Sequence, residues 1–416
     1  MNSKFRFLPL LLLVLFSTQT AFAAEPTIEE LRSRGPAGLQ SLMNQYAEEI
    51  NHHIADPSAP SDARWQQITT ALDTVAQQKN SYLSGLYWHT DIDSAKRASA
   101  ASGKPILSLR LLGKLTDEFS CANSRFFRTV LYSNAEVSAV LRERFVLHWQ
   151  SVRPVPTVTI DFGDGRKLER TLTGNSIHYI LDSQGRPIDA LPGLYGPQAF
   201  LRGLTNAETF FKSLAGKNDQ QRNFMLTMHY SEQHNKLSAA WYSDSVRIGG
   251  KKPEGFRLVP GSKGEALSIA PLAVTKAITE TSILRAMTRA TEELGKITDE
   301  AAWGKIAQLH ASDAVLDERS ISLIKRQNPA LTDQEFAGLL QKFQELIALD
   351  TVRNEYLLHS KLYTWLVRDP IRDDVEKLNE QVYAKLFLTP GSDPWLGLFS
   401  TDVYTALDNG GVVKPR

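Results

Sequence analysis

Residues 104–149 read KPILSLRLLGKLTDEFSCANSRFFRTVLYSNAEVSAVLRERFVLHW. In this stretch, residues 106–112 follow a Gly-Lys-Pro break and are mostly apolar, which predicts a short strand. Cys121 opens a run whose apolar side chains recur at helical spacing, and Asn134 can cap a second helix. Residues 145–149 predict another strand. The stretch therefore predicts a βαβ unit with its cysteine at the start of a helix.

Segments on both sides of this unit extend the pattern. Residues 88–101 read as a helix that precedes Gly-Lys-Pro, and residues 177–188 read as a strand hairpin. Residues 191–197 and a helix through Phe200 close the segment. This arrangement resembles the thioredoxin-like fold over about residues 85–217. The resemblance implies an α/β domain of the βαβ…ββα type that carries an inserted hairpin.

The sequence differs from the family's active-site pattern at two places. The usual Trp-Cys-x-x-Cys motif is absent, and Ser124 stands at the second cysteine position, so that the motif is C-x-x-S. Matching the strand that ends at residues 181–182 places the family's cis-proline position at Ser176, next to Ile177. The resemblance implies that Ser176 and Ile177 lie in the substrate-binding loop that faces the thiol. We expect this loop to differ from that of a working oxidoreductase.

The first residues indicate export. Lys4 and Arg6 precede an apolar run at residues 8–16, and Ala21-Phe22-Ala23 is a small-x-small cleavage site. This pattern predicts a signal peptide over residues 1–23 and a periplasmic or secreted protein. The run is short for a membrane span, although a retained anchor is an alternative. No second long apolar run follows, which predicts that the mature chain is not embedded in a membrane.

Three regions are predicted after the signal peptide. Residues 24–84 contain two amphipathic helices, which predict a helical hairpin, and residues 85–217 form the thioredoxin-like domain. Residues 154–172 predict an inserted β-hairpin with an Asp-Gly turn. Residues 218–416 predict a mainly helical C-terminal domain. Helices are predicted there at residues 219–241, 274–294, 299–309, 332–349, 351–366 and 371–386.

Composition argues against several classes of function. The formal net charge is +1 and Lys and Arg are dispersed among Asp and Glu, so we expect no nucleic-acid surface. The nine histidines form no metal-binding motif, and neither a serine-hydrolase nor a phosphate-loop motif occurs, so we expect no metal and no cofactor. Strand alternation allows His178 to lie on the same side as Cys121, although a structural histidine is the more common case.

Cys121 is the candidate for chemistry, and as the single cysteine it can form no internal disulfide. A thiolate at a helix N-terminus is stabilised by the helix dipole and by free backbone N–H groups. Ser124 can donate a hydrogen bond to this thiolate, and Arg125, one turn further, adds positive charge. Such a monothiol can exchange with a client's disulfide, or can reduce a peroxide and form a sulfenic acid that an outside thiol resolves.

The alternative is that Cys121 is a buried small residue in a domain that kept the fold without the activity, since free cysteines are among the most buried residues. The protein is then a non-catalytic module that binds another exported protein. Redox chemistry requires a solvent-reachable thiol at the start of a helix. A thiol buried under side chains would instead favour the non-catalytic module.

Overall fold

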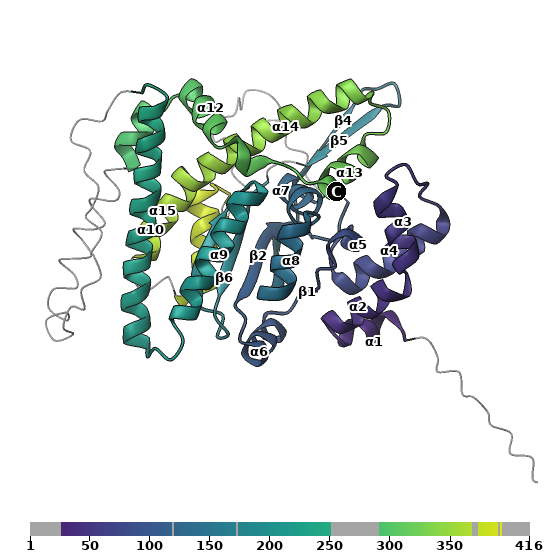
Figure 1. The fold of residues 1–416 in the computed structure, drawn as a ribbon, viewed down its shortest axis with the longest axis horizontal. Coiled ribbons are helices and arrows are strands. Elements are labelled where there is room, and N and C mark those ends of the chain that lie inside the picture. The colour runs from purple at the N-terminus through teal and green to yellow at the C-terminus, as the bar shows by residue number, and fades with distance from the viewer. Residues whose placement is uncertain are drawn as a thin grey trace, which may run out of the picture.

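The structure is a computed structural model, and it describes residues 26–118, 120–171, 174–250, 291–367, 373–389 and 392. A mixed β-sheet lies at the centre with helices on both of its faces, and the N-terminal helices pack at one side (Figure 1). The predicted signal peptide, most of the helix predicted at residues 274–294 and the tail after residue 392 lie outside the described residues.

The N-terminal region is more divided than the predicted helical hairpin. The first helix ends early because Gly35 has a φ of 66° and Pro36, which lacks an N–H group, starts the next helix. A further break follows at Tyr46. The first helix of the predicted hairpin is therefore divided into three, whereas the second is a single helix at Ala63–Ala76. The helices of this region are α1 (Ile28–Ser33), α2 (Pro36–Gln45), α3 (Ala47–Ala55), α4 (Ala63–Ala76) and α5 (Ser81–Ser84).

The central sheet has the strand order β1-β3-β2-β6-β7. β3 runs parallel to both β1 and β2, whereas β6 runs antiparallel to β2 and to β7. The predicted strands at residues 106–112 and 145–149 and the predicted hairpin at residues 177–188 are confirmed. The strands are β1 (Trp88–His89), β2 (Ile106–Leu112), β3 (Val146–Arg153), β6 (Ser176–Leu181) and β7 (Pro187–Pro192).

The segment before Gly-Lys-Pro differs from its prediction at its first residues. The helix there is α6 (Ile92–Ser102), and it starts only after Asp91, whose side chain caps it. Trp88 and His89 instead form β1 at the edge of the sheet. The Trp88 indole is buried and donates a hydrogen bond to Gln78 at 2.8 Å, which fixes this strand against the N-terminal helices.

The two faces of the sheet pack against different helices, because side chains alternate along each strand. Leu107, Leu109 and Leu111 of β2 point to one core. That face is covered by α7 (Ala122–Phe126), η1 (Phe127–Leu131), α8 (Ala135–Arg144) and α9 (Pro197–Ser213). Ile106 and Leu112 point to the other core. That face is covered by α6, α10 (Asp219–Arg247), α15 (Ser360–Leu366), α16 (Val375–Gln381) and η5 (Val382–Leu386).

The C-terminal region is helical, as predicted, and its side chains complete both cores. The predicted boundary at residue 350 is wrong, because no Gly or Pro stands near it and the helical run continues from Asp333 to Leu366. The remaining elements are α12 (Glu300–Leu309), η2 (Ala311–Ala314), α13 (Glu318–Gln327), α14 (Asp333–Arg353) and η3 (Asn354–His359). No helix in the described part of the chain is long and apolar enough to cross a bilayer.

The inserted hairpin is also confirmed. It consists of β4 (Thr157–Asp161) and β5 (Lys167–Thr171), which pair with each other outside the central sheet. The connection uses Gly163 and Gly165 at φ angles of 75° and 90°, which a glycine adopts without strain. Figure 1 shows the hairpin at the periphery of the molecule, at one end of α14.

Candidate functional site

Cys121 is the N-cap residue of α7. Its Sγ accepts a hydrogen bond from the backbone N–H of Ser124 at 3.4 Å, as a capping side chain does. η1 follows α7 directly, so the helical run continues to Leu131. The prediction that Cys121 opens a helix after the strand β2 is therefore confirmed.

The thiol of Cys121 is buried. The residue is 0% exposed and belongs to the core on the Ile106 face of the sheet. Burial raises the pKa of the thiol, and the backbone N–H groups around it and the more distant Arg125 offset this rise only in part. The neutral thiol is therefore favoured over the thiolate, whereas a nucleophilic cysteine needs the reverse.

Ser124 and Arg125 lie near the thiol but contact it differently from the prediction. The bond from Ser124 to Sγ comes from its backbone N–H, and its buried hydroxyl has no hydrogen-bond partner among the described residues. Arg125 is exposed and donates to the Thr171 hydroxyl at 3.2 Å. Its charge is the smallest of the influences that lower the pKa of Cys121. Neither side chain activates the thiol in this conformation.

Ser176 and Ile177 are brought close to the Cys121 helix. The Ser176 hydroxyl accepts a hydrogen bond at 2.8 Å from the amide of Asn123, two residues after Cys121. Ile177 shares the apolar core of the thiol. Both Ser176 and Ile177 are 0% exposed. Both residues begin strand β6, so the segment predicted as a loop is a strand, and neither residue presents an exposed side chain to a substrate.

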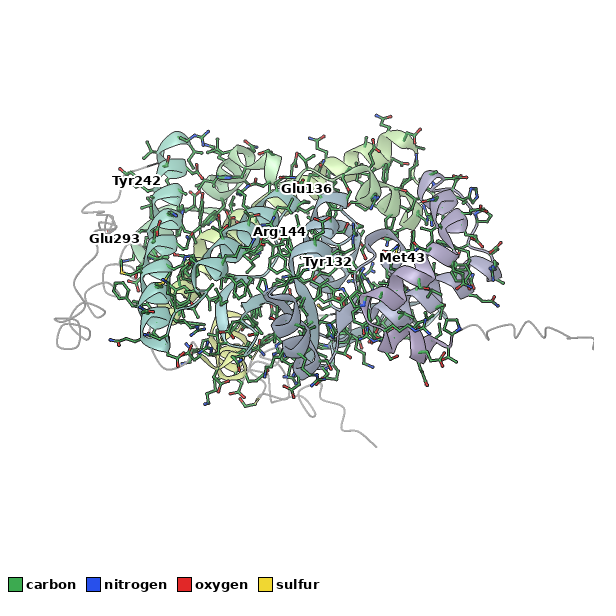
Figure 2. The ribbon with its side chains drawn as sticks, turned by 60° about the horizontal axis from the view of Figure 1, so that its bottom comes forward. Met43, Tyr132, Glu136, Arg144, Tyr242 and Glu293 are labelled. Atoms are coloured by element: carbon green, nitrogen blue, oxygen red, sulfur yellow. The ribbon has the colours of Figure 1, made fainter. Side chains whose placement is uncertain are left out.

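His178 lies on the opposite face of the sheet from Cys121. It follows Ile177 on β6, and strand alternation turns its ring away from the core that holds the thiol. Its Nε2 makes a 2.7 Å hydrogen bond with the hydroxyl of Tyr132, which is labelled in Figure 2. Burial lowers the pKa of His178 to about 3, so the ring is neutral. The expectation that His178 shares the side of Cys121 is wrong.

A segment near the C-terminus closes the core that contains the thiol. We call residues 374–389 the C-terminal cover, and it includes α16 and η5. Glu376 accepts a 2.6 Å hydrogen bond from the buried guanidinium of Arg110 on β2. Tyr383 lies in the same core as Cys121, and its hydroxyl donates at 3.2 Å to the backbone just before β6. The cover therefore packs on the face of the sheet that holds Cys121.

A buried polar cluster centres on Asp189 of β7. Its carboxylate accepts hydrogen bonds at 3.4 Å from His229 of α10, His359 of η3 and Tyr363 of α15. Burial by itself would raise the pKa of Asp189, but the bonds from His229 and His359 outweigh it, so the pKa is lowered. These partners lie 40, 170 and 174 positions from Asp189, so no local motif reveals them.

A second polar cluster centres on His310. Its Nε2 lies 2.6 Å from Asp244 of α10, and its Nδ1 lies 3.6 Å from Asp313 of η2. Arg202 of α9 also binds Asp313, and Tyr356 of η3 donates to Asp244 at 2.7 Å. Bonds to the two carboxylates raise the pKa of His310 to about 9, so the imidazole is charged at neutral pH. The cluster joins α9 to the C-terminal helices.

The structure provides little support for a metal or catalytic role of these clusters. Among the residues that it describes, no three His, Cys, Asp or Glu side chains are placed to hold a metal ion. The members of each cluster are largely paired with one another, and they connect elements that are far apart in the chain. Their shifted pKa values are therefore explained by structural pairing.

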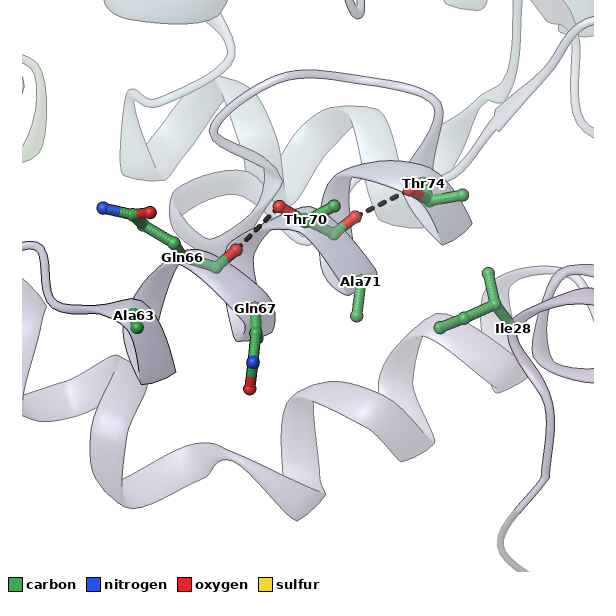
Figure 3. A pocket seen from close by; sticks show the side chains of 7 residues that line it. All are labelled: Ile28, Ala63, Gln66, Gln67, Thr70, Ala71 and Thr74. Atoms are coloured by element: carbon green, nitrogen blue, oxygen red, sulfur yellow. Dashed lines mark hydrogen bonds between the residues drawn. The ribbon is translucent and has the colours of Figure 1, made fainter.

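An open groove lies on the N-terminal helices, as Figure 3 shows. Its volume is about 500 Å³. The hydroxyls of Thr70 and Thr74 donate at 2.7 Å to carbonyls of their own helix, not into the groove. The lining residues carry no charge and no thiol, so they form no catalytic constellation. They are Ile28, Ala63, Gln66, Gln67, Thr70, Ala71 and Thr74.

Comparison of the chain with protein-family models found no match. Comparisons with curated proteins and with solved structures also found none. Support for a function therefore comes from the surroundings of Cys121 and from the surfaces of the molecule.

Proposed function

We propose that this protein is an exported, non-catalytic module built on a thioredoxin-like domain, and that it binds another exported protein. The burial of Cys121 carries the proposal, because the residue is 0% exposed and its thiol pKa is raised. A neutral and inaccessible thiol is a poor nucleophile toward a disulfide or a peroxide. In this role Cys121 caps α7 and fills the core.

The strand arrangement supports the thioredoxin-like part of the proposal. The order β1-β3-β2-β6-β7 combines parallel pairs around β3 with antiparallel pairs around β6. A βαβ unit followed by a ββα unit produces such a mixed sheet. Cys121 follows β2 at the start of the connecting helix, and Ser176 lies beside that helix. These are the relations that the resemblance implies.

The C-terminal cover supports the absence of catalysis. It fills the side of the sheet next to Cys121, and the ion pair from Arg110 to Glu376 holds it there. A partner protein would therefore contact a different surface. The α/β domain and the C-terminal helices share both cores, so together they form a rigid support for that surface.

A second candidate is a monothiol protein that acts in thiol-disulfide exchange or peroxide reduction through Cys121. One observation favours it, because the Ser124 N–H already points at Sγ and would stabilise a thiolate at the helix start. In the exchange step, the thiolate attacks one sulfur of a client disulfide, forms a mixed disulfide and releases the other sulfur as a thiolate. This function requires the C-terminal cover to move away from Cys121.

Alkylation of the single cysteine tests the two candidates. The non-catalytic proposal expects Cys121 to react at least about 100-fold more slowly in the native protein than in urea, because the core must open first. The matched control is Ala122→Cys in a Cys121→Ser background, because residue 122 is exposed and one position further along. Native labelling of Cys121 as fast as this control, with a depressed pKa, would support the monothiol candidate and overturn the proposal.

Partner binding gives the second readout. If the protein is a non-catalytic module, Cys121→Ser and the unmodified chain should co-purify the same exported protein, and a reductant should not release it. If Cys121 exchanges disulfides, the unmodified chain should hold its client through a bond that a reductant breaks, and Cys121→Ser should hold none.

A further inference from the structure

The strand β4 presents an unpaired edge to solvent. Its five residues are all exposed, and within the described residues it pairs only with β5. Val158, Ile160 and the adjoining Phe162 are 36%, 46% and 54% exposed. Edge strands usually carry a lysine, a proline or a bulge that prevents pairing with another chain. β4 reads TVTID and contains none of these.

The hydrogen-bond pattern identifies the backbone groups at this edge. The Phe162 N–H donates to the Arg166 carbonyl at 3.1 Å, so these opposed residues form a hydrogen-bonded pair. Hydrogen-bonded and non-hydrogen-bonded pairs alternate along an antiparallel ladder. The opposed residues Ile160 and Leu168 are therefore bonded to each other. It follows that the N–H and C=O of Thr159 point away from β5, toward the free edge.

We propose that this edge pairs antiparallel with β4 of a second copy of the same chain, in a two-fold arrangement centred on Thr159. The two Thr159 residues then oppose each other and exchange both of their outward backbone bonds. Val158 opposes Ile160 of the second copy, which places apolar β-branched side chains next to each other. This self-association goes beyond the proposed function, which concerns a different exported protein.

The charges along the two strands of the hairpin favour β4 of a second copy as the strand that pairs at this edge. In the proposed register Asp161 opposes the uncharged Thr157 of the second copy, and no like charges face each other. The other edge of the hairpin is less suitable for the same pairing. A two-fold pairing of β5 centred on Glu169 would oppose two carboxylates, and one centred on Leu168 would oppose Arg166 and Arg170.

The pairing also extends an apolar face. Ile160 and Leu168 oppose each other and lie on one face of the hairpin, together with Val158. Two hairpins joined through β4 form a four-stranded sheet, in which Leu168 and Ile160 of one copy continue into Val158 of the other, while Arg166 and Arg170 lie on the outer strands of this face. Three or more strands with an apolar face are more stable than a two-stranded hairpin alone. The joined sheet thus places Val158 and Ile160 of the two copies in contact with each other.

The test measures the molar mass of the full chain by sedimentation and light scattering up to about 100 µM, a range that detects a weak interface. The decisive variant is Thr159→Pro, which removes an outward N–H and keeps the bonds between β4 and β5. The matched control is Glu169→Pro, because Glu169 opposes Thr159 and its N–H points to the outer edge of β5. Far-UV circular dichroism and the urea midpoint show that both variants fold.

The unmodified chain and Glu169→Pro should form dimers, and Thr159→Pro should raise the dissociation constant at least about tenfold. A short bismaleimide should cross-link Thr159→Cys to a dimer and should not cross-link Glu169→Cys. The unmodified chain, whose Cys121 is buried, shows how much cross-linking occurs without an added cysteine. A monomer at every concentration, or equal dissociation by both proline variants, would overturn the proposal. A dimer that resists Thr159→Pro would also overturn it, because another surface would then hold the copies together.

Discussion

The guanidinium of Arg110 in the central strand β2 forms an ion pair with Glu376 of α16 at 2.6 Å, across 266 positions of the chain. The Arg110 side chain is 1% exposed, and that of Glu376 is 56% exposed. Burial lowers the pKa of Arg110, and the nearby Glu376 opposes this shift, so a buried charge depends on one partly exposed partner. The pair fixes the C-terminal cover on the sheet beside Cys121.

Loss of this ion pair should loosen the C-terminal cover. Glu376→Gln leaves the buried Arg110 without its countercharge, and we expect the free energy of unfolding to fall by about 1–3 kcal/mol. Urea denaturation measures the change. Glu380→Gln, on the exposed side of the same helix, is the matched control and should stay within about 0.5 kcal/mol of the unmodified chain. Equal effects of the two variants would show that the Arg110 pair does not stabilise the cover.

Two substitutions of Cys121 should separate capping from core filling. Cys121→Ala removes the group that accepts the Ser124 N–H, and we expect a loss of about 1–2 kcal/mol. Cys121→Ser keeps an acceptor in the same place, so its loss should be smaller. Urea denaturation at one pH compares the three proteins. A larger loss for Cys121→Ser than for Cys121→Ala would mean that the apolar character of the site outweighs the cap.

Stability should fall at alkaline pH because of His310. The folded pKa of about 9 lies above the ordinary 6.5, so the stabilising contribution is fully present below pH 6.5 and is lost as pH rises through 9. We expect a loss of about 1–3 kcal/mol over this window, measured by urea denaturation. His310→Gln should be less stable than the unmodified chain at pH 6.5 and should lack most of this pH dependence. The same alkaline loss in both proteins would contradict the assignment to His310.

Acid should destabilise the fold in part through His148. Its Nδ1 makes a 2.8 Å hydrogen bond with Ser108, and burial lowers its pKa from 6.5 to about 3. Between these values the unfolded chain binds one more proton, so stability falls as pH falls. His148→Gln should reduce the slope of unfolding free energy against pH by about 1.4 kcal/mol per unit near pH 5. An unchanged slope in His148→Gln would contradict the prediction.

Local patterns predicted the elements around Cys121 well. The apolar run at residues 106–112, the cysteine that begins a helix and the Asn134 cap all occur as expected. They were predictable because strand periodicity and helix capping depend on neighbours within a few residues. The first N-terminal helix differs from its prediction for an equally local reason, because Gly35 and Pro36 interrupt it.

The polar pairings around the site could not be predicted in the same way. Asp189 meets His229 and His359, and His310 meets Asp244, across 40 to 170 positions. No periodicity links such residues, since their proximity follows from how helices pack on the sheet. His178 lies on the other face of the sheet from Cys121, because the loop before Cys121 brings the thiol to the core that contains Ile177.

The sequence by itself determined the strands and helices next to Cys121, the single thiol at a helix start and the inserted hairpin, because each depends on short-range chemistry. Only the tertiary structure decided whether that thiol meets solvent. A segment more than 250 positions downstream folds over the sheet and removes Cys121 from water, held by the pair between Arg110 and Glu376. Burial is a property of the whole packed chain, and it sets both the pKa and the accessibility of the sulfur.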